Sequence, residues 1–273
     1  MATMTERTPG RSPARRARTA YRKWVDPLLV VGVLLAVWEL ASIRFGIPEY
    51  IAPRPSVIAE CLVEESGVLL RNLVPTAQAS LLGFAIGNAL AIAMAVGFVY
   101  SKRLERSVYP LAVMSKTIPT VAISPLLVMI FGSGLTPKVI IAALICFFPT
   151  LVNMLKGFES VSANEIELFR IISASRREVF VKLRLFKSLP YLFAALRIAT
   201  TNAVIGAIVA EWIGSAEGIG ALIVQASFNF DAPLLYASMF VAGVFALLFF
   251  GAVGVVERIV LRWKPMGATT VSA

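Results

Sequence analysis

The sequence predicts an all-α, polytopic membrane protein with about six transmembrane helices. The first observation is composition: of 273 residues, 58% are hydrophobic and only 15% are charged, whereas a soluble domain carries about a quarter charged residues. The second is that the apolar residues gather in long runs, most of them near the ~20 residues that cross a bilayer. The third is that the basic residues lie between these runs. One buried core helix could be equally apolar, but several such runs in one chain indicate membrane spans.

Six apolar runs are the expected spans, over residues 27–43, 74–100, 108–131, 138–157, 189–212 and 233–260. In the second run, Gly83 and Gly87 form a G-x-x-x-G pair, which permits close contact between helices. In the third, Pro119 and Pro125 interrupt the backbone hydrogen bonds, which is tolerated where neighbouring groups or water satisfy the freed carbonyls. We therefore expect the third span to be one kinked, partly hydrated helix.

The net charge of +10 is concentrated in four segments, at residues 1–26, 102–106, 170–187 and 258–264. These hold seven, three, six and three of the 26 basic residues. An excess of Lys and Arg marks cytoplasmic segments, so both termini are predicted to be cytoplasmic. The organisation expected is a disordered basic tail (1–26), a permease-like membrane domain (27–264) and a cytoplasmic C-terminal tail (265–273). A basic tail also occurs in nucleic-acid-binding arms, but a tail beside a membrane span favours topology, so no nucleic acid is expected.

Several kinds of chemistry are excluded. There is no histidine, and Cys61 and Cys146 have neither metal-ligand spacing nor a disulfide pattern. The sequence has no G-x-x-x-x-G-K-[ST] phosphate loop, no paired carboxylates and no nucleophile elbow. We therefore expect a transport subunit rather than an enzyme, with no metal site and no cofactor bound by this chain.

Ionisable and polar residues inside the spans are candidates for a translocation path, because burying them in lipid is costly. Lys116 lies about nine residues into its span, or ~13 Å along the axis, and would suit an aqueous path for an anionic or carbonyl-bearing solute. A structural ion pair, or a lysine that reaches the cytoplasmic surface, explains it as well. The other candidates are Pro119, Asn153, Asn202 and Glu211. Hydrogen bonds between helices explain the two asparagines equally well. Glu39 and Glu211 would reach water at the outer ends of their spans. Arg197, about two turns into its span, would snorkel or bind a phosphate.

The connection over residues 158–189 is charged and free of Pro and Gly, yet its apolar residues recur at helical spacing. These residues are Leu168, Ile171, Ile172, Val179, Phe180, Leu183 and Leu185. A solvated connection does not need an apolar stripe, so the pattern predicts a helix that docks on a partner.

Residues 165–190 resemble the cytoplasmic signature loop of permease subunits in binding-protein-dependent ABC importers. That loop reads Glu-Ala-Ala, three residues, Gly, nine residues, Ile, one residue, Leu-Pro. Here Glu167 takes the glutamate position, Ser173 the glycine, Leu183 the isoleucine and Leu185 the leucine. The departures are Leu168 and Phe169 for the two alanines, Ser173 for glycine, and Phe186 for proline.

Other segments are similar to the permease class for nitrate, sulfonate and taurine, which includes permeases for thiamine and riboflavin precursors. They are residues 38–40, 118–127 with 131–132, 147–153, 189–197 and 209–214 with 218–220. Together they cover roughly residues 36–262. The altered signature loop is slightly closer to the vitamin-precursor permeases.

The resemblance implies a prokaryotic inner-membrane importer. Two copies of this permease, as a homodimer in membrane lipid, would work with a cytoplasmic ATPase dimer that binds ATP and with an extracytoplasmic solute-binding protein. The residues implied in coupling to the ATPase are Glu167, Leu168, Ile171, Ile172, Ser173, Leu183 and Leu185. The substrate would be a small polar nutrient, either a sulfonate, nitrate or taurine-like anion or a thiamine or riboflavin precursor. The alternative is a secondary transporter or channel that works alone, which predicts inverted repeats and coupling sites at mid-membrane.

Overall fold

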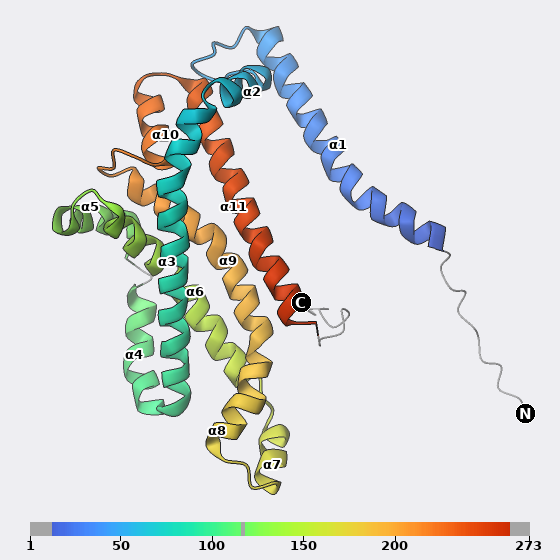
Figure 1. Ribbon diagram of the computed structural model, residues 1–273, viewed down its shortest axis with the longest axis vertical. Coiled ribbons are helices and arrows are strands. Elements are labelled where there is room, and N and C mark those ends of the chain that lie inside the picture. Colours follow the sequence, from blue (N-terminus) through green and yellow to red (C-terminus); the bar gives the residue numbers. More distant parts are fainter. Residues whose placement is uncertain (1–12, 116–117, 263–273) are drawn as a thin grey trace, which may run out of the picture.

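The computed structural model describes residues 13–115 and 118–262, and within these ranges it contains helices and no strand (Figure 1). In chain order the elements are α1 (Pro13–Phe45), α2 (Pro55–Glu64), α3 (Ser66–Tyr100), α4 (Lys102–Ser115), α5 (Thr120–Phe131), α6 (Leu135–Glu159), α7 (Ala163–Ile171), α8 (Arg176–Val179), the π-helical segment η1 (Phe180–Arg184), α9 (Leu185–Glu211), α10 (Ile219–Phe228) and α11 (Ala232–Val260). Figure 1 places α7 and α8 at one end of the molecule and α2 and α10 at the other.

Five helical stretches of the described chain are long and apolar enough to cross a membrane: Val25–Phe45, Ser66–Tyr100, Leu135–Glu159, Arg176–Glu211 and Ala232–Val260. These confirm the all-helical, polytopic architecture. The expected span over residues 108–131 is different, because it is divided between α4 and the shorter α5, which runs at an angle to it (Figure 1). Pro119 is the residue before α5, with an extended ψ of 116°. Pro119 also disfavours helical geometry in Ile118, the residue before it. The helix therefore ends before Pro119 and a new one starts after it, so the expectation of one kinked helix was wrong.

The core of the bundle is α3, α6 and α9, which pack through small residues. A Cβ atom added at Gly83 or Gly87 of α3 would collide with Ala142 or Ala143 of α6. One added at Gly206 of α9 would lie 2.8 Å from the Cα atom of Ala142. Helices in lipid associate by close packing of this kind, since there is no hydrophobic gain from leaving an apolar solvent. The close contact predicted from the G-x-x-x-G pair is confirmed.

Helix α1 begins at Pro13, although disorder was expected up to residue 26; residues 1–12 lie outside the described range. The C-terminal end of α1 contacts the bundle: the ring of Trp38 lies 5.8 Å from that of Tyr236 on α11. The carboxylate of Glu39 accepts hydrogen bonds from the backbone N–H (3.0 Å) and the hydroxyl (2.7 Å) of Ser56 at the start of α2. Glu39 therefore joins α1 to α2, instead of only reaching water as expected.

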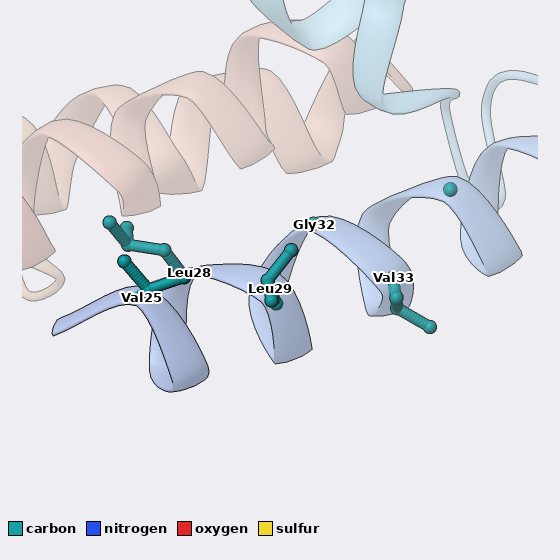
Figure 2. A pocket seen from close by; sticks show the side chains of 6 residues that line it. Val25, Leu28, Leu29, Gly32 and Val33 are labelled. Carbon is teal, nitrogen blue, oxygen red and sulfur yellow. The ribbon is translucent and has the colours of Figure 1, made fainter. Parts of the chain in front are cut away.

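Below this junction α1 stands apart from the other helices (Figure 1). A shallow hollow of about 370 Å³ on this stretch of α1 has an apolar lining. Figure 2 draws the side chains that line it. The lining residues are Val25, Leu28, Leu29, Gly32, Val33 and Ala36. Such a surface suits lipid or an apolar partner, and it offers no polar group to a polar solute.

Candidate functional site

The α7–α8 corner, residues 162–180, is formed by two short helices with matching starts. At α7, the Ser162 hydroxyl accepts from the Glu165 backbone N–H, and the Glu165 side chain accepts from the Ser162 backbone N–H. The same capping box joins Ser175 and Glu178 at α8. Each box satisfies two N–H groups that a helix start leaves without partners, so both helix starts are fixed by their own sequence.

The turn between these helices explains the role of Ser173. Its φ is +56°, in the left-handed region. Its N–H bonds to the carbonyl of Arg170 (2.8 Å), and the N–H of Ala174 bonds to that of Phe169 (2.9 Å). This pair of bonds is a Schellman motif, whose left-handed residue is usually glycine. Ser173 holds the position at which the resembling signature loop has glycine, so the backbone there is what a glycine would favour.

Three of the predicted coupling residues form an exposed apolar patch on the α7–α8 corner. Leu168, Ile171 and Ile172 are 59%, 75% and 67% exposed, and Glu167 is exposed beside them. The corner lies at the far end of the molecule (Figure 1). Apolar side chains gathered among charges mark a surface that a partner covers.

Leu183 and Leu185 are half-buried and belong to a different part of the structure. They lie in the continuous helix formed by α8, η1 and α9. The Phe180 ring anchors this helix, 5.3 Å from the ring of Tyr100 on α3 and 5.5 Å from that of Phe158 on α6. The single apolar stripe expected over residues 168–185 is therefore two surfaces, a free patch on α7 and an inward-facing support.

An ion pair between Glu165 and Lys187 ties α7 to the beginning of α9. The hydrogen bond from Lys187, and then those from Ser162, lower the pKa of Glu165 to about 2. The Glu165 carboxylate is thus charged at any physiological pH and available to pair with Lys187.

The predicted path residues do not form one cluster in the described part of the chain. Lys116 lies outside the described residues. Pro119 is exposed before α5, and Asn202 is half-buried on α9. The Asn153 side chain donates to the carbonyl of Pro149 within α6 (2.8 Å), which supports the helix next to a proline. Their place in a translocation path stays a prediction.

Glu211, the fifth path candidate, is buried in an enclosed polar cluster at the C-terminal end of α9. Its carboxylate accepts from the Thr76 hydroxyl (2.9 Å) and from the Gly220 backbone N–H (2.8 Å), and it pairs with Lys138 (3.5 Å). A Cβ atom at Gly218 would collide with this carboxylate. The expectation that Glu211 reaches water is wrong, because its side chain has no exposed surface.

The same cluster, which we call the Glu211 cluster, fastens the start of α10. Thr76 accepts from the backbone N–H of Ile219 (2.8 Å), and Asn72 accepts from that of Gly218 (3.0 Å). Lys138 donates to the carbonyl of Glu217 (2.8 Å). Sequence reasoning missed Lys138 and Thr76 as partners of Glu211. The signal in the sequence was the pair Gly218 and Gly220, which indicates that another group comes close to the backbone there.

Arg197 is part of an ion pair between α9 and α11. Its Nε lies 2.6 Å from Oε2 of Glu257, in a contact that lacks good hydrogen-bond geometry. The guanidinium also lies over the Phe250 ring, 5.3 Å from its centre, in the space left by Gly254. Charged residues within membrane helices commonly pair in this way, so the expected snorkelling is replaced by a contact between helices.

Comparison with known proteins identifies the class to which this architecture belongs. Residues 87–263 match the family described as binding-protein-dependent transport system inner membrane component, and the chain belongs to this family. The family predicted from the signature loop is thereby confirmed: the chain is a multi-pass permease of the ABC importer type. The alternative of a transporter that works alone is not supported.

Individual relatives cover nearly the whole chain. It is 34% identical to the formylaminopyrimidine transport permease protein ThiX of Halalkalibacterium halodurans, over 88% of this chain and 96% of ThiX. It is 32% identical to the riboflavin transport system permease protein RibX of Chloroflexus aurantiacus, over 85% and 87% of the two chains. A chain from the inward-facing MetNI methionine ABC transporter shares the fold, with a TM-score of 0.58 at 18% identity, covering 74% of this chain and 98% of that one.

Proposed function

We propose that this permease forms the membrane path of an importer for a small polar nutrient, and that a thiamine or riboflavin precursor is a better candidate than a sulfonate. Two relatives above 30% identity are named for formylaminopyrimidine and riboflavin transport. A relative named for aliphatic sulfonates, from Bacillus subtilis, is 28% identical. Nitrate and taurine-like anions remain in the wider class of candidates.

The observation that carries the proposal is the apolar patch of the α7–α8 corner. Leu168, Ile171 and Ile172 are exposed on a helix whose start and end are both fixed by hydrogen bonds. A rigid helix with an apolar face suits a groove on a partner protein. In our proposal the partner is a cytoplasmic ATPase dimer, which binds and hydrolyses ATP, while this chain binds no cofactor and catalyses no reaction.

The remaining assembly follows from the same proposal. Two copies of the permease would enclose the path, and an extracytoplasmic binding protein would deliver the solute. The orientation is N-in and C-in. It is supported by the basic residues of α4 and of the α7–α8 corner, which lie at the same end of the molecule (Figure 1), as expected for cytoplasmic segments.

The decisive test is Ile172→Asp in the permease purified with its ATPase. Removing a buried interface anchor commonly costs ~2 kcal/mol or more, which is over about tenfold in association. A carboxylate left unpaired in the groove makes the loss larger. We expect loss of ATPase copurification, or of hydrolysis stimulated by loaded binding protein, with normal abundance in the membrane.

Arg176→Ala is the matched control, because Arg176 is an exposed residue of the same corner whose loss removes charge without apolar contact. We expect it to have a mild effect. Full assembly and full stimulation in the Ile172→Asp protein would refute the coupling role of α7.

A further inference from the structure

The contact between Arg197 of α9 and Glu257 of α11 leaves donors of the guanidinium unused. Nε of Arg197 and Oε2 of Glu257 are buried and lie 2.6 Å apart, but they do not form a hydrogen bond. In the described part of the chain the guanidinium has this one carboxylate partner, and 34% of the Arg197 side chain is exposed. A guanidinium has five N–H donors, so several of them are available to an acceptor from outside the chain.

The guanidinium is held in a fixed position. It lies over the Phe250 ring, 5.3 Å from the ring centre, as in cation–π contacts. Gly254 leaves the space that the guanidinium occupies, because a Cβ atom at Gly254 would lie 2.9 Å from Nη2 of Arg197. A group that is already fixed loses little freedom on binding. The planar N–H groups of arginine match the oxygens of a phosphate in bidentate pairs.

A second arginine lies on the same face of α11. Residues three and four apart are neighbours on a helix, so Phe250, Gly254 and Arg258 form one row along α11, with Glu257 beside them. Arg258 is exposed. Glu257 neutralises the charge of Arg197, and Arg258 adds a further positive charge. The face therefore carries a net positive charge beside the unused donors of Arg197.

The surface around these arginines is apolar and exposed. On α11, Val255, Val256 and Ile259 are 55%, 51% and 57% exposed, and Ile198 of α9 is 52% exposed. Helix α11 is long and apolar enough to cross a membrane, and Arg258 lies in its last turn. At the end of a span, exposed apolar side chains meet acyl chains and the adjacent charges meet headgroups. A phosphate at this level belongs to a phospholipid rather than to a solute in water.

We propose that Arg197 and Arg258 bind the phosphate group of an anionic phospholipid. Glu257 and Phe250 position the Arg197 guanidinium, and the acyl chains lie along the exposed apolar residues of α9 and α11. Basic groups between membrane helices recognise acidic headgroups through the same chemistry. Under the proposed N-in, C-in orientation, this lipid lies in the inner leaflet. The site is separate from the translocation path and does not depend on which solute is carried.

Phosphatidylglycerol is the probe, added to the purified full-length permease in a neutral detergent. A ligand that binds the folded state raises the melting temperature as its concentration rises. Phosphatidylcholine with the same acyl chains is the comparison, because its choline brings a positive charge that Arg258 repels. We expect phosphatidylglycerol to give a saturable rise in melting temperature and phosphatidylcholine to give little. An equal response to both lipids would overturn the anionic site.

Arg258→Gln is the main variant, because its loss leaves the pair of Arg197 with Glu257 in place. The phosphatidylglycerol concentration that gives half of the maximal shift should rise about fivefold, as for one basic residue at an anionic headgroup. Arg103→Gln is the matched control, since Arg103 is an exposed arginine of α4 and its loss changes the net charge equally. It should leave that concentration unchanged. An unchanged value in Arg258→Gln, or an equal rise in Arg103→Gln, would overturn the site.

Arg197→Lys tests the guanidinium while keeping a positive charge beside Glu257. Lysine cannot present two parallel N–H groups, so the half-saturating concentration should rise at least about tenfold. An unchanged value would remove Arg197 from the site and refute the proposal.

A last titration distinguishes a lipid headgroup from free phosphate. Inorganic phosphate replaces the lipid, and potassium chloride of equal ionic strength is the reference. We expect the melting temperature to be the same in both salts. A rise in phosphate that Arg258→Gln abolishes would identify a site for a soluble phosphate and overturn the lipid as its occupant.

Discussion

The α7–α8 corner and the corner between α10 and α11, residues 226–231, have similar local structures but are attached to the rest of the molecule differently. Each has a short helix, of nine residues in α7 and ten in α10, and each helix ends in a Schellman motif with a residue other than glycine in the left-handed position. Throughout its length α7 buries no residue, and a half-buried ion pair joins it to α9. The start of α10 is fixed by the buried Glu211 cluster. The α7–α8 corner can therefore shift with a moving partner, whereas the α10–α11 corner is held rigidly to the bundle.

The largest expected effect is the loss of Lys138 from the Glu211 cluster. Lys138→Met leaves a buried carboxylate without its cation, which costs about 3–5 kcal/mol, and should lower the melting temperature in detergent strongly. The Lys138→Met/Glu211→Gln double variant should be less destabilised, because it removes the stranded charge. Lys182→Met is the counterpart in the α7–α8 corner, where the pair with Glu178 is exposed, and should have little effect. A small change in the melting temperature of Lys138→Met would contradict the conclusion that the Glu211 cluster holds α10 rigidly.

A smaller effect is expected when a methyl group is forced into the same cluster. Gly218 has φ +123°, and a Cβ atom there would collide with the Glu211 carboxylate. Strain and displacement together should cost about 2–4 kcal/mol in Gly218→Ala, measured as unfolding in detergent. Gly134→Ala is the control, since a Cβ atom there meets nothing within 4 Å. Equal stability of both variants would show that α10 moves aside easily.

The two left-handed residues offer a gain in stability. Glycine relieves about 1–2 kcal/mol of strain in this region, partly offset by the freedom it adds to the unfolded chain. Ser173→Gly and Phe230→Gly should therefore each stabilise by about 0.5–1 kcal/mol. Ser173→Gly should also keep ATPase coupling, because glycine fits the same turn. Loss of stability in either variant would contradict the turn geometry.

The smallest effect is pH dependence of the α7–α8 corner. The pKa of Glu165 is lowered to about 2 from its ordinary value of 4.5, so the folded state favours its charged form. This contribution is complete above the unfolded value and is lost as the pH falls from ~4.5 to about 2. Amide exchange in α7, corrected for its intrinsic pH dependence, should increase over that window while exchange in α10 stays slow. Lys187→Met should reduce the pH effect to the part that the hydrogen bonds from Ser162 maintain. A matching increase in α10 would indicate general acid unfolding.

The sequence predicted the membrane architecture well, because composition and charge act over whole segments. The signature loop was predicted to dock on a partner, and the structure exposes Leu168, Ile171 and Ile172 there. The break between α4 and α5 was missed, since the prolines at 119 and 125 are compatible with either a kink or two helices. Periodicity alone also could not separate the exposed part of the stripe from the part around Leu183 that faces inward.

Polar pairing between distant residues could not be predicted. Glu211 and Lys138 lie 73 positions apart, and nothing in either local segment identifies the other as its partner. Arg197 and Glu257 meet only because α9 and α11 pack together, at the notch that Gly254 provides. Single residues in spans are therefore recognisable as costly to bury, while their partners depend on the tertiary fold. Lys116, Pro119, Asn153 and Asn202 retain their place in the path as predictions.

The π-helical segment Phe180–Arg184 sets the direction in which the docking patch faces. The N–H of Leu185 bonds to the carbonyl of Phe180, so this turn contains one residue more than an α-helical turn. Each residue advances an α-helix by about 100°, and the extra residue changes the angular phase of everything that precedes it. Deleting Val181 would restore a regular helix and turn α8 and α7 by about that angle around the axis of α9. The direction in which the patch faces thus depends on the number of residues in this π-helical turn, and not only on the side chains of the patch.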